Sequence, residues 1–127
     1  MSFPRILLVD DVRLFLELEK SFLHLAQVEL LTAANGEEAL AIIRRERPDL
    51  VFLDLYMPVL DGAACCAAIK GDPELSATPV VMVTTGGKPD EVEQCRTAGC
   101  DGLLTKPLDR SAFLDTVSRF IPSFNRG

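Results

Sequence analysis

Acidic residues follow two apolar runs that are typical of buried parallel strands. Asp54 closes the run Leu50-Val51-Phe52-Leu53, and the pair Asp10-Asp11 closes a similar run near the N-terminus. Two further runs end near Thr84 and Lys106. Because open α/β sheets gather their chemistry at the carboxyl ends of their strands, we expect these groups to share one rim.

Three carboxylates at one rim predict a metal site. Two carboxylates about 4 Å apart repel by roughly 4 kcal/mol at an effective dielectric of about 20. A third acid adds to this repulsion, so the group must take up protons or recruit a cation. Oxygen ligands suit Mg²⁺, which commonly completes its shell with a phosphate, and Mn²⁺ could substitute for it. We therefore expect Asp10, Asp11 and Asp54 to bind the metal.

The same rim has the groups that phosphoryl transfer needs. Asp54 is the candidate nucleophile, which would form an acyl phosphate. Lys106 would contact one phosphoryl oxygen as a point charge, and the Thr84 hydroxyl would donate to another. Lys106-Pro107 suits a tight turn with a cis peptide bond. Without a histidine base or a glycine-rich phosphate loop, turnover should be slow. We therefore expect a signalling domain that catalyses only its own phosphorylation and slow dephosphorylation.

Short β-branched runs alternate with longer amphipathic segments, which predicts a parallel sheet with crossover helices. The expected fold is a flavodoxin-like, doubly wound (βα)5 sheet of five parallel strands in the order 2-1-3-4-5, with helices on both faces. We expect strands near 4–9, 28–32, 49–53, 79–83 and 101–104. The expected helices lie near 12–26, 36–46, 61–70, 88–98 and 109–120.

Local signals mark several helix ends. Asn35-Gly36 and Asp61-Gly62 each open a helix, and Asp109 is a candidate N-cap for the last one. Arg47-Pro48 should end the second helix, because the residue before proline is disfavoured in helical geometry.

Composition limits the class of protein. A chain of 127 residues that is 48% hydrophobic suits one domain, which we place at 1–122, with 123–127 as a tail or the start of a linker. No apolar stretch could span a membrane, and no signal peptide is present, so we expect a cytoplasmic protein. A net charge of −6 argues against direct nucleic-acid binding. Vicinal Cys65-Cys66 predict packing more than redox chemistry.

Four motifs together resemble the receiver domain of bacterial two-component response regulators, over essentially the whole chain. The resemblance implies that a histidine kinase or phosphotransfer protein donates a phosphoryl group from phosphohistidine to Asp54. The motifs are Val9-Asp10-Asp11, Asp54-Leu55-Tyr56-Met57-Pro58-Val59-Leu60-Asp61-Gly62, Pro79-Val80-Val81-Met82-Val83-Thr84 and Lys106-Pro107.

The resemblance also implies roles for single residues. Asp11, Asp54 and the backbone carbonyl of Tyr56 would hold Mg²⁺, with Asp10 acting through water. Thr84 and Lys106 would follow the phosphoryl group and shift the loop after the fourth strand. That shift would remodel the face of the fourth helix, fifth strand and fifth helix. This face would act on a downstream effector or a fused output domain, and it could form a dimer.

The sequence departs from the family pattern at three places. Leu103 stands where many members have a tyrosine or phenylalanine that acts as a rotamer switch. Thr85 replaces a small residue and precedes Gly86-Gly87, so we expect a mobile loop there. Leu108 replaces a phenylalanine that often follows Lys-Pro.

Other functions fit the residues less well. A phosphatase of the haloacid dehalogenase type would need an acid at Tyr56 and a nucleophile on the first strand. A flavin-binding domain would need a phosphate loop where Asp10-Asp11 stand. The stronger alternative is a phosphorylation-independent receiver-like module for protein docking. The cognate kinase and the output stay open.

Overall fold

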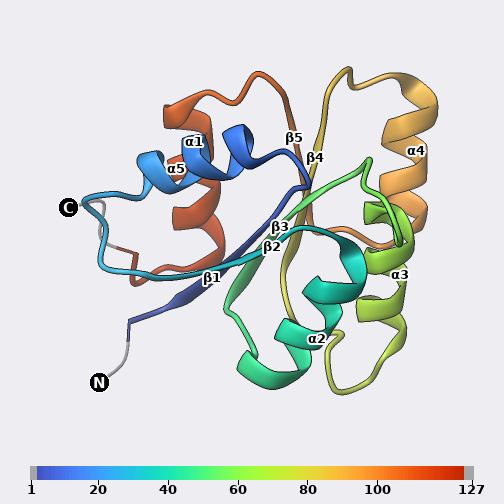
Figure 1. The fold of residues 1–127 in the computed structure, drawn as a ribbon, viewed down its shortest axis with the longest axis horizontal. Coiled ribbons are helices and arrows are strands. Elements are labelled where there is room, and N and C mark those ends of the chain that lie inside the picture. The colour runs from blue at the N-terminus through green and yellow to red at the C-terminus, as the bar shows by residue number, and fades with distance from the viewer. Residues whose placement is uncertain (1–2, 125–127) are drawn as a thin grey trace.

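Five strands alternate with five helices along the chain, as the sequence pattern predicts (Figure 1). The computed structural model describes residues 3–124. The strands are β1 Arg5–Val9, β2 Glu29–Ala33, β3 Leu50–Asp54, β4 Val80–Thr84 and β5 Gly102–Thr105. The helices are α1 Arg13–Phe22, α2 Gly36–Glu46, α3 Gly62–Gly71, α4 Pro89–Thr97 and α5 Arg110–Phe120.

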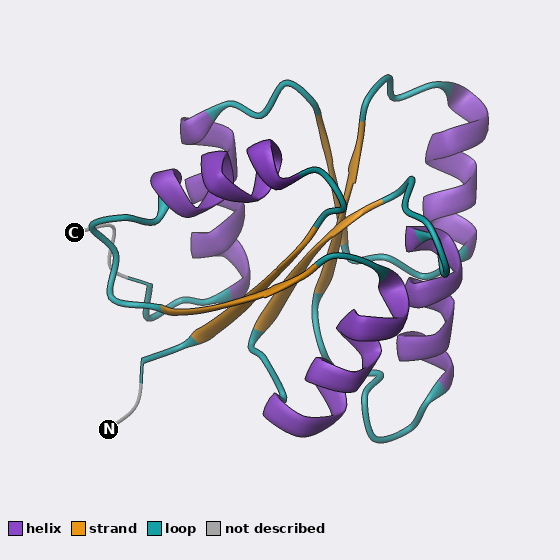
Figure 2. Ribbon diagram, in the orientation of Figure 1, coloured by secondary structure: helices purple, strands orange, loops and turns teal. Residues whose placement is uncertain are grey.

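The strands form one parallel sheet in the order β2-β1-β3-β4-β5, which confirms the expected topology. Helices α1 and α5 cover one face of this sheet, and α2, α3 and α4 cover the other (Figure 2). The chain therefore has the doubly wound, flavodoxin-like arrangement, with β1 and β3 adjacent where the winding direction changes.

A hydrophobic cluster lies on each side of the sheet. Every residue of β3 and β4 is buried, as expected for central strands covered on both faces. On the α1 and α5 side, the Phe52 and Phe113 rings stack with centroids 4.3 Å apart. On the other side, Cys65 and Cys66 pack in the core, and desolvation by burial raises the pKa of each thiol to about 12. Burial thus confirms the expected packing role of the cysteine pair.

The expected capping residues begin their helices. The side chains of Asn35, Asp61 and Asp109 accept hydrogen bonds from the backbone N–H groups of Glu38, Ala64 and Ala112. These bonds satisfy donors that the first helical turn leaves free. Arg47 ends α2 with a φ of 49°, in the left-handed region, so its proline neighbour does mark the end of the helix.

Helix α1 is shorter than expected: the pattern predicted a helix to residue 26, but α1 ends at Phe22. The backbone N–H groups of Leu23 and His24 bond back three residues, to Lys20 and Ser21. Bonds of this spacing tighten the final turn and stop the helix. The apolar pattern continues past the end because Leu23 and Ala26 still pack into the core.

The C-terminal end of the described chain packs on the domain. Phe124 lies against the cluster on the α1 and α5 side, and its backbone N–H donates to Ile121. The expected tail begins at 123, and its residues 125–127 lie outside the described part. The domain boundary at 122 stays a prediction. No helix within residues 3–124 is both long and apolar enough to cross a bilayer.

The stacked pair Phe52 and Phe113 should contribute strongly to stability, because it joins the central strand to α5. We expect Phe113→Ala to lower the free energy of unfolding by about 3–5 kcal/mol, through lost burial and the cavity that remains. Urea unfolding monitored by circular dichroism would measure this change. The matched control Phe3→Ala removes a ring that is largely exposed and should have little effect. Equal losses in the two variants would contradict the expected role of the ring.

Candidate functional site

Strand register brings the expected residues to one rim of the sheet. Val9 of β1 lies opposite Leu53 of β3, so Asp10 and Asp54 follow at the same level. Asp54 in turn lies opposite Val83, one residue before Thr84. Thr84 pairs with Thr105, and Lys106 comes next along the chain. Parallel pairing therefore places the acids, the hydroxyl and the ammonium group at the carboxyl ends of four adjacent segments.

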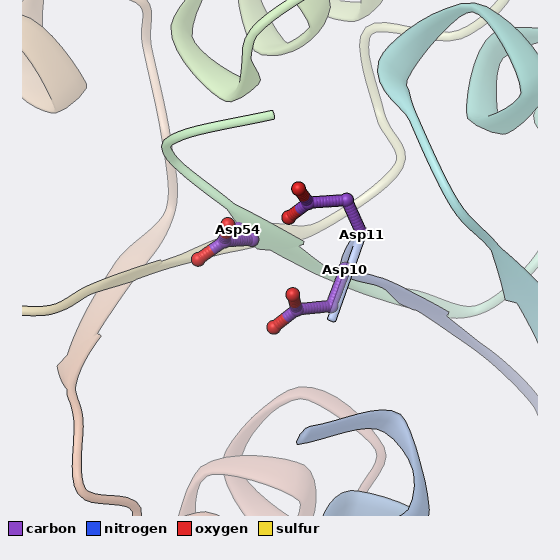
Figure 3. A group of neighbouring side chains, drawn as sticks. All are labelled: Asp10, Asp11 and Asp54. Carbon is purple, nitrogen blue, oxygen red and sulfur yellow. The ribbon is translucent and has the colours of Figure 1, made fainter. Parts of the chain in front are cut away.

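The three aspartates form a cluster with the donor set of a metal site. One carboxylate oxygen from each of Asp10, Asp11 and Asp54 lies within 4.8 Å of the others. Their side chains point into the same space at the ends of β1 and β3 (Figure 3). Asp10 and Asp54 are buried, at 1% and 6% exposure, whereas Asp11 is exposed. Hard oxygen ligands with an open side fit a divalent cation that keeps part of its water shell.

Lys106 joins the two buried acids. Its ammonium nitrogen lies 2.9 Å from Asp10 Oδ2 and 3.1 Å from Asp54 Oδ1. The Lys106 side chain is only 6% exposed. Burial alone would lower the pKa of this lysine, but the hydrogen bonds to the two carboxylates outweigh burial and leave the pKa raised. Lys106 is therefore held as a buried cation between the carboxylates of Asp10 and Asp54.

One lysine does not balance three acids. Desolvation and, to a lesser extent, the Asp10 carboxylate raise the pKa of Asp54 to about 6, against the opposing effect of Lys106. The metal-free site thus disfavours the charged form of Asp54. A bound cation would favour that charged form, so the residues present fit the binding of a divalent metal.

Thr84 is held by the loop that follows it. Its side chain is fully buried, and its Oγ1 accepts a hydrogen bond of 3.2 Å from the backbone N–H of Gly87. Its carbonyl accepts a bond of 2.7 Å from the backbone N–H of Lys106. These contacts fix the hydroxyl and the start of the lysine turn against each other. The Lys106-Pro107 peptide bond is cis, as the tight turn suggested.

The loop after Asp54 folds back tightly on the strand. Gly62 was expected only to start a helix, but a Cβ at this position would lie 2.2 Å from the Asp54 carbonyl oxygen. Its N–H donates to the Leu55 carbonyl over 2.8 Å. Glycine is needed here because any side chain would push α3 away from the strand that carries Asp54. The expected role of the Tyr56 carbonyl in metal binding stays a prediction.

Two residues of α1 that the sequence analysis did not single out also face the site. The ammonium group of Lys106 lies 3.7 Å from the centre of the Phe15 ring, which favours the cation. Glu19, one turn further along α1, is 2% exposed. Desolvation and, to a lesser extent, the Asp10 carboxylate raise the pKa of Glu19 to about 8. The sequence does contain a signal for Glu19, which is its spacing: it lies four residues after Phe15 and so on the same face of the helix.

The raised pKa of Glu19 predicts a pH-dependent stability. Between pH about 4.5 and about 8 the unfolded chain loses this proton while the folded chain keeps it. The folded state should therefore lose stability as pH rises through this window, by an amount on the order of 5 kcal/mol. Glu19→Gln should remove the contribution of Glu19 and leave the smaller loss from Asp54, whose pKa is also raised. Urea unfolding at several pH values without divalent metal would measure both.

Glu17→Gln is the matched control for this prediction, since Glu17 is an exposed glutamate of the same helix. It should leave the pH dependence of stability as in the wild type. If the wild type and Glu19→Gln show parallel curves, Glu19 does not hold its proton in the folded state.

Comparisons with known proteins agree with this geometry. Residues 6–118 match the family described as the response regulator receiver domain. Protein PilG of Pseudomonas aeruginosa is 31% identical over 120 residues, covering 94% of this chain and 89% of PilG. The structure of the phosphorylated cyanobacterial phytochrome response regulator RcpA is 30% identical, with a TM-score of 0.84, and covers 96% of both chains. The Mn²⁺-bound form of the response regulator Rcp1 is 30% identical, with a TM-score of 0.78, covering 91% of this chain and 90% of Rcp1.

The family match runs from Ile6 in β1 to Ser118 in α5. It therefore includes every rim residue from Asp10 to Lys106. Members of this family are signalling domains of two-component systems and bind divalent metal ions. The chain belongs to the family of response regulator receiver domains.

Proposed function

We propose that this chain is a phosphoacceptor that takes a phosphoryl group on Asp54 in the presence of Mg²⁺. The observation that carries the proposal is the contact of Lys106 with both Asp10 and Asp54 inside the acidic cluster. This arrangement places a buried cation beside the candidate nucleophile and leaves a net negative charge for a metal to balance. Of the two similar structures, one is described as phosphorylated and the other as Mn²⁺-bound.

The residues would divide the work as follows. An oxygen of Asp54 attacks the phosphorus of a phosphohistidine, the bond from phosphorus to nitrogen breaks, and an acyl phosphate forms on Asp54. Asp10, Asp11, Asp54 and the Tyr56 carbonyl would hold Mg²⁺, which supplies positive charge beside the phosphoryl oxygens.

The positive and hydroxyl groups of the rim would then hold the product. Lys106 exchanges one carboxylate partner for a phosphoryl oxygen, which a flexible ammonium group beside both acids can do. The Thr84 hydroxyl already accepts from Gly87, so its own proton remains to donate to a second phosphoryl oxygen.

The proposed partners follow from this role. A histidine kinase or a phosphotransfer protein would supply the phosphoryl group. An effector protein or a fused output domain would respond to the face made by α4, β5 and α5. A dimer through the same face is a further proposal. If the chain instead docks proteins without phosphorylation, Asp54 should stay unmodified under the conditions below.

Acetyl phosphate offers a direct test, because it can donate a phosphoryl group without a partner protein. We expect intact-mass spectrometry to detect one added phosphoryl group on the wild type with Mg²⁺, and none after chelation with EDTA. Asp54→Asn should gain nothing, since an amide oxygen is a far weaker nucleophile than a carboxylate.

Asp90→Asn is the control, because it makes the same chemical change at an exposed acid of α4. It should be modified like the wild type. No mass gain in the wild type, or an equal gain in Asp54→Asn, would overturn the assignment of Asp54 and favour the docking module.

A further inference from the structure

Helix α4 has few buried anchors. Within Pro89–Thr97 only Glu91 and Cys95 are buried. Cys95 packs in the core near the end of the helix, whereas Glu91 lies in the first turn. A helix with so little buried apolar surface is the kind of element that opens or shifts most readily. The contacts of Glu91 therefore have a large influence on where α4 begins.

Both carboxylate oxygens of Glu91 have partners. Oε1 accepts a hydrogen bond of 3.2 Å from the backbone N–H of Lys88, which satisfies a donor at the start of the helix. Oε2 accepts a hydrogen bond from the hydroxyl of Tyr56. Tyr56 lies only two residues after Asp54, so this second bond joins the phosphoacceptor loop to α4.

These bonds belong to a longer connection around the site. Gly87, next to Lys88, donates its backbone N–H to the Thr84 hydroxyl oxygen. The path therefore runs from the Asp54 loop through Tyr56 to Glu91, and back through the loop 85–88 to Thr84. Gly86 and Gly87 in this loop have wide backbone freedom, so the loop alone would fix Thr84 poorly. Glu91 bonds to both Lys88 and Tyr56, so it anchors the end of this loop to the Asp54 loop.

We propose that Tyr56 and Glu91 are positioning residues. Their hydrogen bond connects the first turn of α4 to the phosphoacceptor loop, and so transmits the phosphorylation state of Asp54 to α4. This inference rests on the proposed function of Asp54. It gives the chain a connection between the site and α4 although Leu103 replaces the aromatic residue of the usual switch. Tyr56 lies in the loop after β3, whereas Leu103 is partly buried against the core.

The existence of the bond in solution can be tested by spectroscopy, because Tyr56 is the single tyrosine of a chain without tryptophan. The hydrogen bond to Glu91 raises the pKa of Tyr56 to about 12, although Tyr56 is 54% exposed. At pH about 10 an ordinary phenol is half ionised. We expect the wild type to show little tyrosinate absorbance at this pH, and Glu91→Gln to show clearly more, with folding checked by circular dichroism.

The coupling between the Asp54 loop and α4 is tested by hydrogen exchange of the α4 amides. Exchange is measured with and without saturating Mg²⁺ and beryllofluoride, a mimic of the phosphoryl group. Tyr56→Phe removes only the hydroxyl, and Glu91→Gln removes only the charge. In the ligand-free protein we expect each change to speed α4 exchange by roughly tenfold, as for loss of a hydrogen bond to a charged group. The amide of Glu91→Gln can still accept a hydrogen bond, so this change weakens the contact while Tyr56→Phe removes it. The double variant should therefore show less than the product of the two single effects, because both changes act on the same contact.

Saturating beryllofluoride should change α4 exchange in the wild type and have little effect on it in either variant. Glu93→Gln is the control: it breaks an exposed ion pair with Arg96 on the same helix, so it should change exchange far less and keep the response to beryllofluoride. Two results would overturn the proposal. The variants could exchange like the wild type with and without beryllofluoride, or the double variant could show the full product of the two single effects on the exchange rate. A wild type in which amides beside Asp54 respond to beryllofluoride while α4 does not would also overturn the proposal. If no amide responds, the proposed function of Asp54 fails, and exchange in the ligand-free protein alone decides whether the bond anchors α4.

Discussion

The contact of Lys106 with Asp10 and Asp54 is the interaction on which the site depends. It joins residues that follow β1, end β3 and follow β5, so one ammonium group links three segments of the rim. Burying a charged pair costs free energy, and such a pair gives little net stability. Here the negative charge also exceeds the positive charge, because Asp11 adds a third carboxylate. The arrangement is better suited to binding a cation than to stabilising the fold.

The rest of the domain holds this unfavourable group of charges in place. Central strands β3 and β4 are buried throughout and fix the register that aligns the rim. Gly62 allows α3 to begin against the backbone of Asp54, where any side chain would collide. The Phe15 ring beside Lys106 adds a contact that favours the cation without adding another charge. Core packing therefore stabilises the domain, while the rim keeps its imbalance of charge.

Much of this could be predicted from local sequence. The strand order, the caps at Asn35, Asp61 and Asp109, and the meeting of Asp10, Asp11, Asp54 and Lys106 follow from apolar runs and the geometry of parallel sheets. The end of α1 could not be predicted, because Leu23 and Ala26 pack into the core beyond the helix and so continue its apolar pattern. The burial of Glu19 could not be predicted either, because it depends on how α1 packs against the rim. The bond from Tyr56 to Glu91 joins a loop to the first turn of α4, 35 residues further along the chain, so no local pattern indicates it.

A crystal structure with Mg²⁺ and beryllofluoride would test the central claim most directly. The account predicts beryllium bonded to a carboxylate oxygen of Asp54 and a cation in contact with Asp11 and Asp54. It also predicts that the ammonium group of Lys106 leaves one of its two acids for a fluoride. A structure with beryllofluoride elsewhere, or with Lys106 still bridging Asp10 and Asp54 beside a metal-free cluster, would contradict it.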